Sequence, residues 1–193
     1  MTQKNLFEVD WSKIPAPSDD GGTAHLKGMA IPSIGLPATD GTLVTLADLG
    51  GRTVVFAYPR TGEPGKIALV DDWDMIPGAR GCTPQTCAFR DLYAELKAAG
   101  AKHVFGLSTQ SNAYQVEMAS RLHLPFAVLS DDKLQLTRAL ELPTMEVAGL
   151  TMIKRLALII DKARITHVFY PVFPPDRNAA DVLAWLKENP AKT

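Results

Sequence analysis

Short, continuous apolar segments separated by helical patterns are the feature that most constrains the fold of this chain. Four of them have the β-branched and aromatic composition of strands buried on both faces: Thr53–Tyr58, His103–Ser108, Phe126–Leu129 and Leu156–Asp161. Arg164–Tyr170 follows the last of them after two residues, which predicts a hairpin. A chain in which strands and helices alternate in this way folds as an α/β sandwich with helices on a central sheet.

Helical patterns lie between these predicted strands. Phe89, Leu92, Leu96 and Ala99 recur at helical spacing, and Gly100 suits the position after the last helical turn. Three more helices are predicted, over Ser111–Leu122, Leu134–Leu140 and Ala179–Lys187. Among the aromatic residues, we expect Tyr58 and Phe89 to pack in the core.

Length and charge limit the classes of protein to which the chain can belong. A chain of 193 residues can build one sizeable core, so we expect a single domain over residues 29–193. Residues 1–28 are rich in Pro, Gly and Asp, and we expect them to form an extended N-terminal arm. The 20 Lys and Arg balance 21 Asp and Glu, which argues against nucleic-acid or anionic-membrane binding. No apolar run approaches the ~20 residues of a membrane span, and the start of the chain lacks the apolar run of a secretion signal. We therefore expect a cytoplasmic protein.

An unusually long connection leads to the only two cysteines, Cys82 and Cys87. The connection covers residues 59–81, and structureless loops longer than roughly 12–15 residues are uncommon in compact domains and often functional. Trp73 within it is interpreted as an anchor that packs the loop, or as a lid over a thiol or a contact for a reductant.

The residues around Cys82 predict the start of a helix. Thr83 suits the N-cap and Pro84 the first helical position, so the helix begins at or just after Cys82. Unpaired N–H groups and the positive end of the helix dipole favour a thiolate at this position, as does nearby Arg80. Local sequence therefore places Cys82 for nucleophilic chemistry.

The spacing of the two cysteines leaves several interpretations open. Five helical residues separate their Cα atoms by about 8–9 Å, whereas a disulfide needs about 7 Å or less. A disulfide would therefore require the first helical turns to unwind. The pair can equally be two unrelated buried cysteines, or belong to a Cys–His hydrolase whose triad the sequence does not reveal. A zinc site needs about four ligands, whereas the histidines are scattered, at His25, His103, His123 and His167. We therefore expect no metal site. We also expect no cofactor.

The segment Gly81–Leu92 closely resembles the peroxidatic helix of peroxiredoxins, in particular the PrxQ type, also called bacterioferritin comigratory protein. Its sequence is Gly-Cys-Thr-Pro-Gln-Thr-Cys-Ala-Phe-Arg-Asp-Leu. Further segments resemble the family in the same order: Ala30–Leu49, Val54–Pro59, Gly106–Ser108, Leu129–Asp131 and Arg155–Asp161. Two positions depart from the family pattern, since Ala79 replaces a Thr or Ser and Met75 replaces a Pro.

This resemblance implies a thioredoxin-like fold, with a central mixed sheet flanked by helices, and a thiol-dependent peroxidase acting on hydrogen peroxide and alkyl hydroperoxides. It also implies that Cys82 is the peroxidatic cysteine and that Cys87 is the resolving cysteine, which condenses with the sulfenic acid to a disulfide. Arg155 would stabilise the thiolate and the peroxide. Thioredoxin or a similar dithiol would reduce the disulfide, and the protein would be a monomer or a homodimer.

Two other functions remain open. The missing hydroxyl at Ala79 is compatible with a non-catalytic peroxide or redox sensor on the same fold. A general dithiol–disulfide oxidoreductase is the other alternative, although such enzymes favour Cys-x-x-Cys spacing and four residues separate Cys82 from Cys87.

Overall fold

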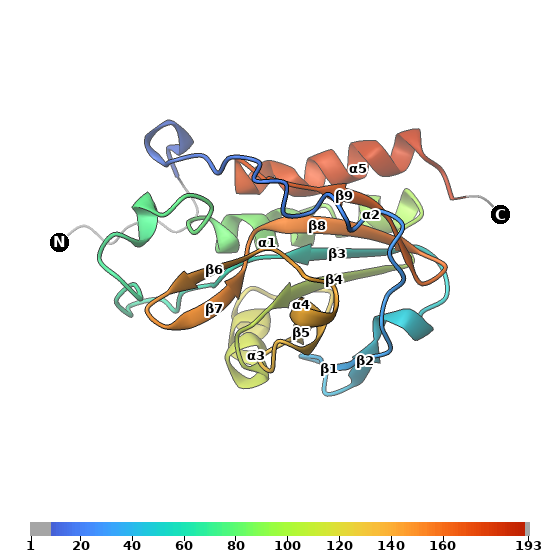
Figure 1. The fold of residues 1–193 in the computed structure, drawn as a ribbon, viewed down its shortest axis with the longest axis horizontal. Helices are drawn as coiled ribbons and strands as arrows, with labels where there is room; N and C mark the ends of the chain where they lie inside the picture. The colour runs from blue at the N-terminus through green and yellow to red at the C-terminus, as the bar shows by residue number, and fades with distance from the viewer. Residues whose placement is uncertain (1–8, 192–193) are drawn as a thin grey trace.

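The computed structural model describes residues 9–191 and has the α/β architecture that the sequence predicts (Figure 1). Its central sheet has the strand order β5-β4-β3-β8-β9, with bounds Val128–Ser130, His103–Ser108, Thr53–Ala57, Leu156–Asp161 and Arg164–Phe169. Strands β3, β4 and β5 are parallel, whereas β8 is antiparallel to both β3 and β9, so the sheet is mixed. The predicted strands and the β8–β9 hairpin are thus confirmed.

The α-helices of the described residues are α1 (Cys82–Asp91), α2 (Tyr93–Ala98), α3 (Asn112–Arg121), α4 (Gln135–Ala139) and α5 (Asn178–Glu188). The single helix predicted through Phe89 and Ala99 is wrong, because Leu92 has φ −97° and ψ 10° and separates α1 from α2. Gly100 follows α2 with a φ of 102°, as predicted. None of the helices between residues 9 and 191 is long and apolar enough to cross a membrane.

Alternate residues of the central strands point into two hydrophobic cores, one on each face of the sheet. Phe56 and Tyr58 belong to the core that α1, α2, α3 and α5 cover, whereas Val55 belongs to the core closed by α4 and by residues 26–46. In the first core Phe56 stacks on Phe89, with ring centroids 4.1 Å apart. Tyr58 and Phe89 are fully buried, as predicted. Burial on both faces explains why these strands are continuous apolar runs.

The pairing of β3 with β8 brings two distant parts of the chain to one edge of the sheet. Thr53 pairs with Ile160 and Ala57 with Leu156, so β8 begins beside the end of β3. Arg155 directly precedes β8, and residues 59–81 follow β3. Arg155 therefore lies at the edge where the long connection begins.

Two small hairpins form sheets of their own, separate from the central sheet. Strands β6 (Thr144–Val147) and β7 (Leu150–Ile153) pair through a turn at Ala148 and Gly149, both at positive φ. Ala-Gly between two short alternating segments is the signal that could have revealed this hairpin. The other hairpin pairs β1 (Gly35–Pro37) with β2 (Leu43–Thr45).

The predicted N-terminal arm can be followed from residue 9, since its first eight residues lie outside the described residues. Figure 1 shows this blue segment along β9, where the Gly28 N–H donates to the Ile165 carbonyl oxygen. Asp20 accepts hydrogen bonds from Lys154 and Tyr170 at 2.6 and 2.7 Å. The division of the chain at residue 28 stays a prediction, and Leu26 is already buried in the second core.

Candidate active site

Helix α1 begins at Cys82, as predicted, but its cap differs from the prediction. Gly81 is the N-cap, in a left-handed conformation with φ 105° and ψ 17° that glycine adopts without strain. Thr83 and Pro84, predicted as cap and first helical residue, are the second and third residues of the helix. Proline is tolerated there because the N–H groups of the first turn have no partner within the helix. Cys82 therefore lies at the positive end of the helix dipole.

The tight packing of Gly81 leads to a prediction about stability. A Cβ atom at this position would lie 2.6 Å from Trp11 Cη2 and 2.6 Å from Pro175 Cγ. Because the left-handed conformation also strains any other residue, we expect Gly81→Ala to lower the free energy of unfolding by about 2–3 kcal/mol. Urea denaturation measures this change. Gly62→Ala is the matched control in the same connection, since its Cβ would have no neighbour within 4 Å, and equal effects of the two substitutions would contradict the packing described.

Arg155, directly before β8, contacts the sulfur of Cys82. Its side chain is buried, and its Nη2 donates to Cys82 Sγ at 3.3 Å. The same nitrogen lies 3.1–3.3 Å from the carbonyl oxygens of residues 78–80. Its Nη1 donates to Gln85 Oε1. The guanidinium thus connects the thiol to the last residues of the long connection.

The acceptors around Arg155 leave its positive charge without a carboxylate partner among the described residues. They are carbonyl oxygens, the Gln85 amide oxygen and the Cys82 sulfur, and the sulfur alone among them can become negatively charged. A buried charge without a counter-ion is costly. A thiolate at Cys82 offsets that cost and accepts a stronger, charge-assisted hydrogen bond.

Gln85 and Asn178 extend this contact into a buried network that the sequence analysis missed. Gln85 Nε2 donates to Asn178 Oδ1 at 2.9 Å, and both side chains are at most 1% exposed. Asn178 is the first residue of α5, so the network joins α1, α5 and the start of β8. Gln85 lies three residues after Cys82 and therefore on the same helix face, which is the only sequence signal that pointed to it.

Arg80 is arranged differently from the expectation that it favours the thiolate. Its Nη1 lies 3.2 Å from Asp74 Oδ1, so a carboxylate balances this charge beside the site. The positive charge that contacts the Cys82 sulfur without a carboxylate partner among the described residues is that of Arg155.

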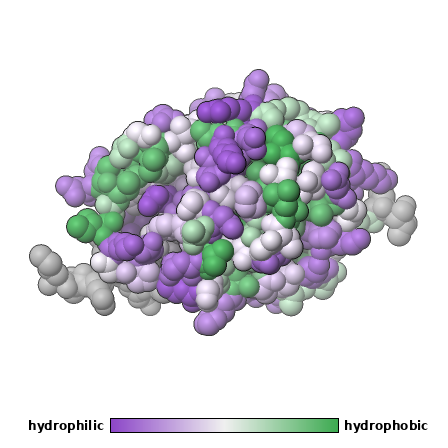
Figure 2. All heavy atoms as spheres, turned by 90° about the horizontal axis from the view of Figure 1, so that it is seen from below, coloured by the Kyte–Doolittle hydropathy of each residue, from purple (hydrophilic) through white to green (hydrophobic). Residues whose placement is uncertain are grey.

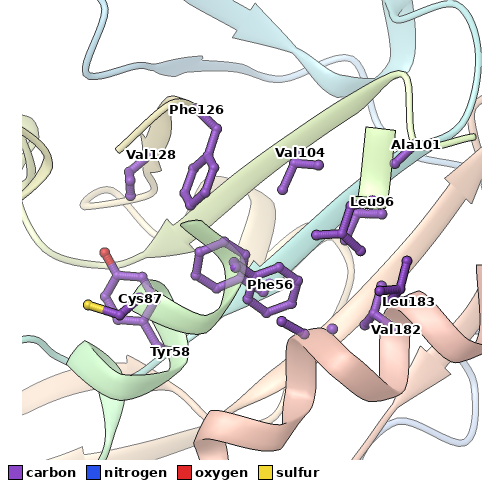
Figure 3. Close-up of a cluster of buried hydrophobic side chains, with 14 of the residues drawn as sticks. Phe56, Tyr58, Cys87, Leu96, Ala101, Val104, Phe126, Val128, Val182 and Leu183 are labelled. Carbon is purple, nitrogen blue, oxygen red and sulfur yellow. The ribbon is translucent and has the colours of Figure 1, made fainter. Parts of the chain in front are cut away.

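Cys87 belongs to the same helix as Cys82, and both side chains are buried in the first core, where Cys87 lies beside Tyr58 (Figure 3). Burial raises the pKa of its thiol. Both cysteines are free. Because helical geometry holds their Cα atoms about 8–9 Å apart, a disulfide between them requires the start of α1 to unwind.

Cys82 also lines a cavity of about 560 Å³. Residues 60–69 of the long connection form much of its wall, and Trp73 lines it as well. Among residues 9–191, no group of three or more His, Cys, Asp and Glu side chains is placed to hold a metal ion.

Comparison with known proteins now identifies the family. A model of the Redoxin family matches residues 26–183. A chloroplastic peroxiredoxin Q of Sedum lineare is 30% identical over 163 residues, which cover 83% of this chain and 77% of that protein. The chain belongs to the peroxiredoxins of the Q type. This membership agrees with the thiol-dependent peroxidase activity that the resemblance implies.

Other relatives of this peroxiredoxin differ in length and organism. Chloroplastic peroxiredoxin Q of Oryza sativa subsp. japonica is 32% identical over 163 residues, and the match covers 83% of this chain and 66% of that protein. The chain thus spans about two thirds of its length. Peroxiredoxin bcp1 of Schizosaccharomyces pombe is 32% identical over 130 residues, covering 66% of this chain and 58% of that protein.

Solved structures confirm the thioredoxin-like fold of this peroxiredoxin. Peroxidoxin BcpB from Mycobacterium tuberculosis has 26% sequence identity and a TM-score of 0.68, with 86% of this chain and 100% of that chain covered. Peroxiredoxin Q of Xanthomonas campestris has the same fold at 23% identity and a TM-score of 0.67, with 86% of this chain and 97% of that chain covered.

This peroxiredoxin departs from the family pattern beside the sulfur. Ala79 provides no hydroxyl, but its carbonyl oxygen lies 3.5 Å from Cys82 Sγ and accepts a hydrogen bond from Arg155. The backbone therefore contacts the sulfur from this position. Met75 is 59% exposed, away from the core.

Proposed function

We propose that this peroxiredoxin reduces hydrogen peroxide and alkyl hydroperoxides, with Cys82 as the peroxidatic cysteine, Cys87 as the resolving cysteine and Arg155 as the group that stabilises the thiolate and the peroxide. The 3.3 Å contact between Arg155 Nη2 and Cys82 Sγ is the observation that carries this proposal. The contact is buried, and the guanidinium has no carboxylate partner among the described residues.

In the first step the Cys82 thiolate attacks the terminal oxygen of the peroxide ROOH. The S–O bond forms as the O–O bond breaks, which leaves Cys82 as a sulfenic acid and releases RO⁻, which takes up a proton to become an alcohol or water. Negative charge develops on the leaving oxygen as the bond breaks. We expect the Arg155 guanidinium, which contacts Cys82 Sγ, and the N–H groups of the first turn of α1 to stabilise that charge.

In the second step Cys87 attacks the sulfenic sulfur, which forms the disulfide and releases water. In the folded helix Cys87 is buried, which raises the pKa of its thiol. Unwinding of α1 would bring the two sulfurs together and would also expose the Cys87 thiol to water. Thioredoxin or a similar dithiol then reduces the disulfide by exchange and is itself oxidised. We propose that the cycle runs in a monomer or homodimer, in the reducing cytoplasm.

The cysteine pair can be tested by mass spectrometry after one equivalent of hydrogen peroxide. We expect the protein to lose two hydrogens and peptide mapping to show a Cys82–Cys87 cross-link, because the sulfenic acid condenses with the second thiol. Cys87→Ser is the matched control and should instead gain one oxygen at Cys82. A wild-type protein that keeps this added oxygen would contradict the resolving role of Cys87.

A peroxide sensor is the second candidate, and the absent hydroxyl at Ala79 favours it. A sensor would form the same disulfide but turn over slowly. Steady-state peroxide consumption with thioredoxin and thioredoxin reductase separates the two functions, since a rate above roughly 1 s⁻¹ lies in the range of enzymes.

A further inference from the structure

The N-terminal arm is attached differently along its length. Among the described residues, no backbone–backbone hydrogen bond joins residues 9–20 to the rest of the chain, whereas Gly28 donates such a bond to β9. Pro17 and Asp20 line a cavity of about 270 Å³ together with Arg155, so the arm is loosely packed there. A segment with few backbone bonds and loose packing opens at a low free-energy cost. Residues 9–20 can therefore leave the body of the protein without disrupting the central sheet.

Trp11 anchors this part of the arm at the start of α1. Its Nε1 donates to Asp176 Oδ2 at 3.0 Å, and its ring packs edge-on against Phe173, with ring centroids 6.0 Å apart. The same ring lies against Gly81, the N-cap of α1, because a Cβ atom added to Gly81 would lie 2.6 Å from Trp11 Cη2. Trp11 thus covers the residue that directly precedes Cys82.

Asp20 is a second anchor of the arm, on the strand that follows Arg155. It accepts hydrogen bonds from Lys154 and Tyr170 at 2.6 and 2.7 Å. Lys154 directly precedes Arg155, whose Nη2 lies 3.3 Å from the reactive sulfur. The arm is therefore tied both to the start of α1 and to the residues that lead into β8.

The long connection before α1 holds the start of the helix less firmly. Its Ile67 is 92% exposed and its Met75 59% exposed, and apolar side chains left in water add no packing energy. Figure 2 shows green, apolar residues on the surface at the end of the molecule that carries this connection and the β6–β7 hairpin. The close contacts at Gly81 come instead from Trp11 and Pro175.

We propose that residues 9–20 form a clasp that keeps the start of α1 helical, with Trp11 as its main positioning residue, and that the clasp opens when Cys87 reaches Cys82. The inference rests on the proposed function, since only disulfide formation requires α1 to unwind. Unwinding moves Gly81 away from the Trp11 ring, so the contact between them is lost. The clasp therefore slows the step in which the Cys87 thiol attacks the Cys82 sulfenic acid, forms the disulfide and releases water.

The rate of disulfide formation tests the clasp. The protein is mixed with hydrogen peroxide, and the sulfenic acid and the disulfide are quantified by mass spectrometry at successive times. We expect Trp11→Ala to raise the first-order rate constant of disulfide formation by about fivefold to tenfold, because loss of the aromatic contacts favours the unwound helix. Trp11→Phe keeps one ring and should fall between the two proteins. Unchanged or slower disulfide formation in Trp11→Ala would overturn the inference.

Trp185→Ala is the matched control, because it removes a second half-buried tryptophan that packs on an aromatic ring. Trp185 stacks on His167, with ring centroids 4.8 Å apart, and lies under Arg52. Arg52 precedes β3, whereas the site of Cys82 lies beyond the other end of that strand. This variant should keep the wild-type rate of disulfide formation. Equal acceleration by Trp185→Ala and Trp11→Ala would show a general loss of stability and contradict the clasp.

Fluorescence follows the opening of the clasp directly. In a protein with Trp73 and Trp185 replaced by phenylalanine, Trp11 is the only tryptophan, and an indole that moves into water emits at longer wavelength. We expect one equivalent of hydrogen peroxide to shift this emission with the rate constant of disulfide formation, and Cys87→Ser in the same background to show no shift. A disulfide that forms without any shift would overturn the inference alone. Absence of the Cys82–Cys87 disulfide from the wild-type protein would overturn the proposed function itself.

Discussion

Replacement of Cys82 by serine is expected to reduce peroxide turnover by at least about a thousandfold. The thiolate is the nucleophile in this chemistry, and a serine hydroxyl does not ionise near neutral pH. The remaining Cys87 is buried and its pKa is raised, so it does not replace the lost thiolate. Oxidation of NADPH in a coupled assay with thioredoxin, thioredoxin reductase and hydrogen peroxide measures the loss.

Cys87→Ser is the matched control, because it makes the same chemical change on the same helix. This variant should still consume one equivalent of hydrogen peroxide rapidly, since Cys82 and Arg155 are intact. It should then lose turnover with thioredoxin, which requires the disulfide. If Cys87→Ser lost the first reaction while Cys82→Ser still consumed one equivalent of hydrogen peroxide, the two cysteines would have the opposite roles.

The central strands could be predicted because a strand that is buried on both faces is a continuous apolar run in the sequence. Thr53–Ala57 and Leu156–Asp161 are apolar almost throughout, and their ends in the structure lie within one residue of the prediction. The sequence pattern of the β6–β7 hairpin is weaker. Its strands, Thr144–Val147 and Leu150–Ile153, are short, half-exposed and mixed in character, so their tertiary surroundings rather than their composition fix them.

The candidate site could be predicted only in part, for a different reason. The position of Cys82 at a helix start could be predicted from the local sequence, because Thr83 and Pro84 directly follow it. The position of Arg155 came from the family resemblance. The hydrogen bond from Gln85 to Asn178 joins residues 93 positions apart, and periodicity within a helix or strand cannot predict such a long-range contact. The pairing of Arg80 with Asp74 likewise depends on the path of an irregular segment.

Arg155→Met is expected to lower kcat/KM for hydrogen peroxide at pH 7 by about 10- to 100-fold. The substitution keeps an apolar stem of similar length but removes the donor that lies 3.3 Å from Cys82 Sγ. Hydrogen bonds to charged groups contribute about 1.5–3 kcal/mol, and each 1.4 kcal/mol corresponds to a factor of about ten in rate. Arg155→Lys should fall between the two proteins, because it retains the charge but not the planar fork that also reaches Gln85 and the carbonyl oxygens of residues 78–80.

A purely structural role for Arg155 would give a different result, and the alkylation rate of Cys82 separates the two. In a Cys87→Ser background Cys82 is the only thiol, so its reaction with iodoacetamide at pH 7 reports the thiolate of the folded protein. We expect Arg155→Met to slow this reaction to the same extent as peroxide reduction, and Arg138→Met, which removes an exposed charge from α4, to leave it unchanged. Loss of peroxide reduction with an unchanged alkylation rate would mean that Arg155 acts on the peroxide alone. Unchanged values of both rates would show that another group compensates the charge of the thiolate.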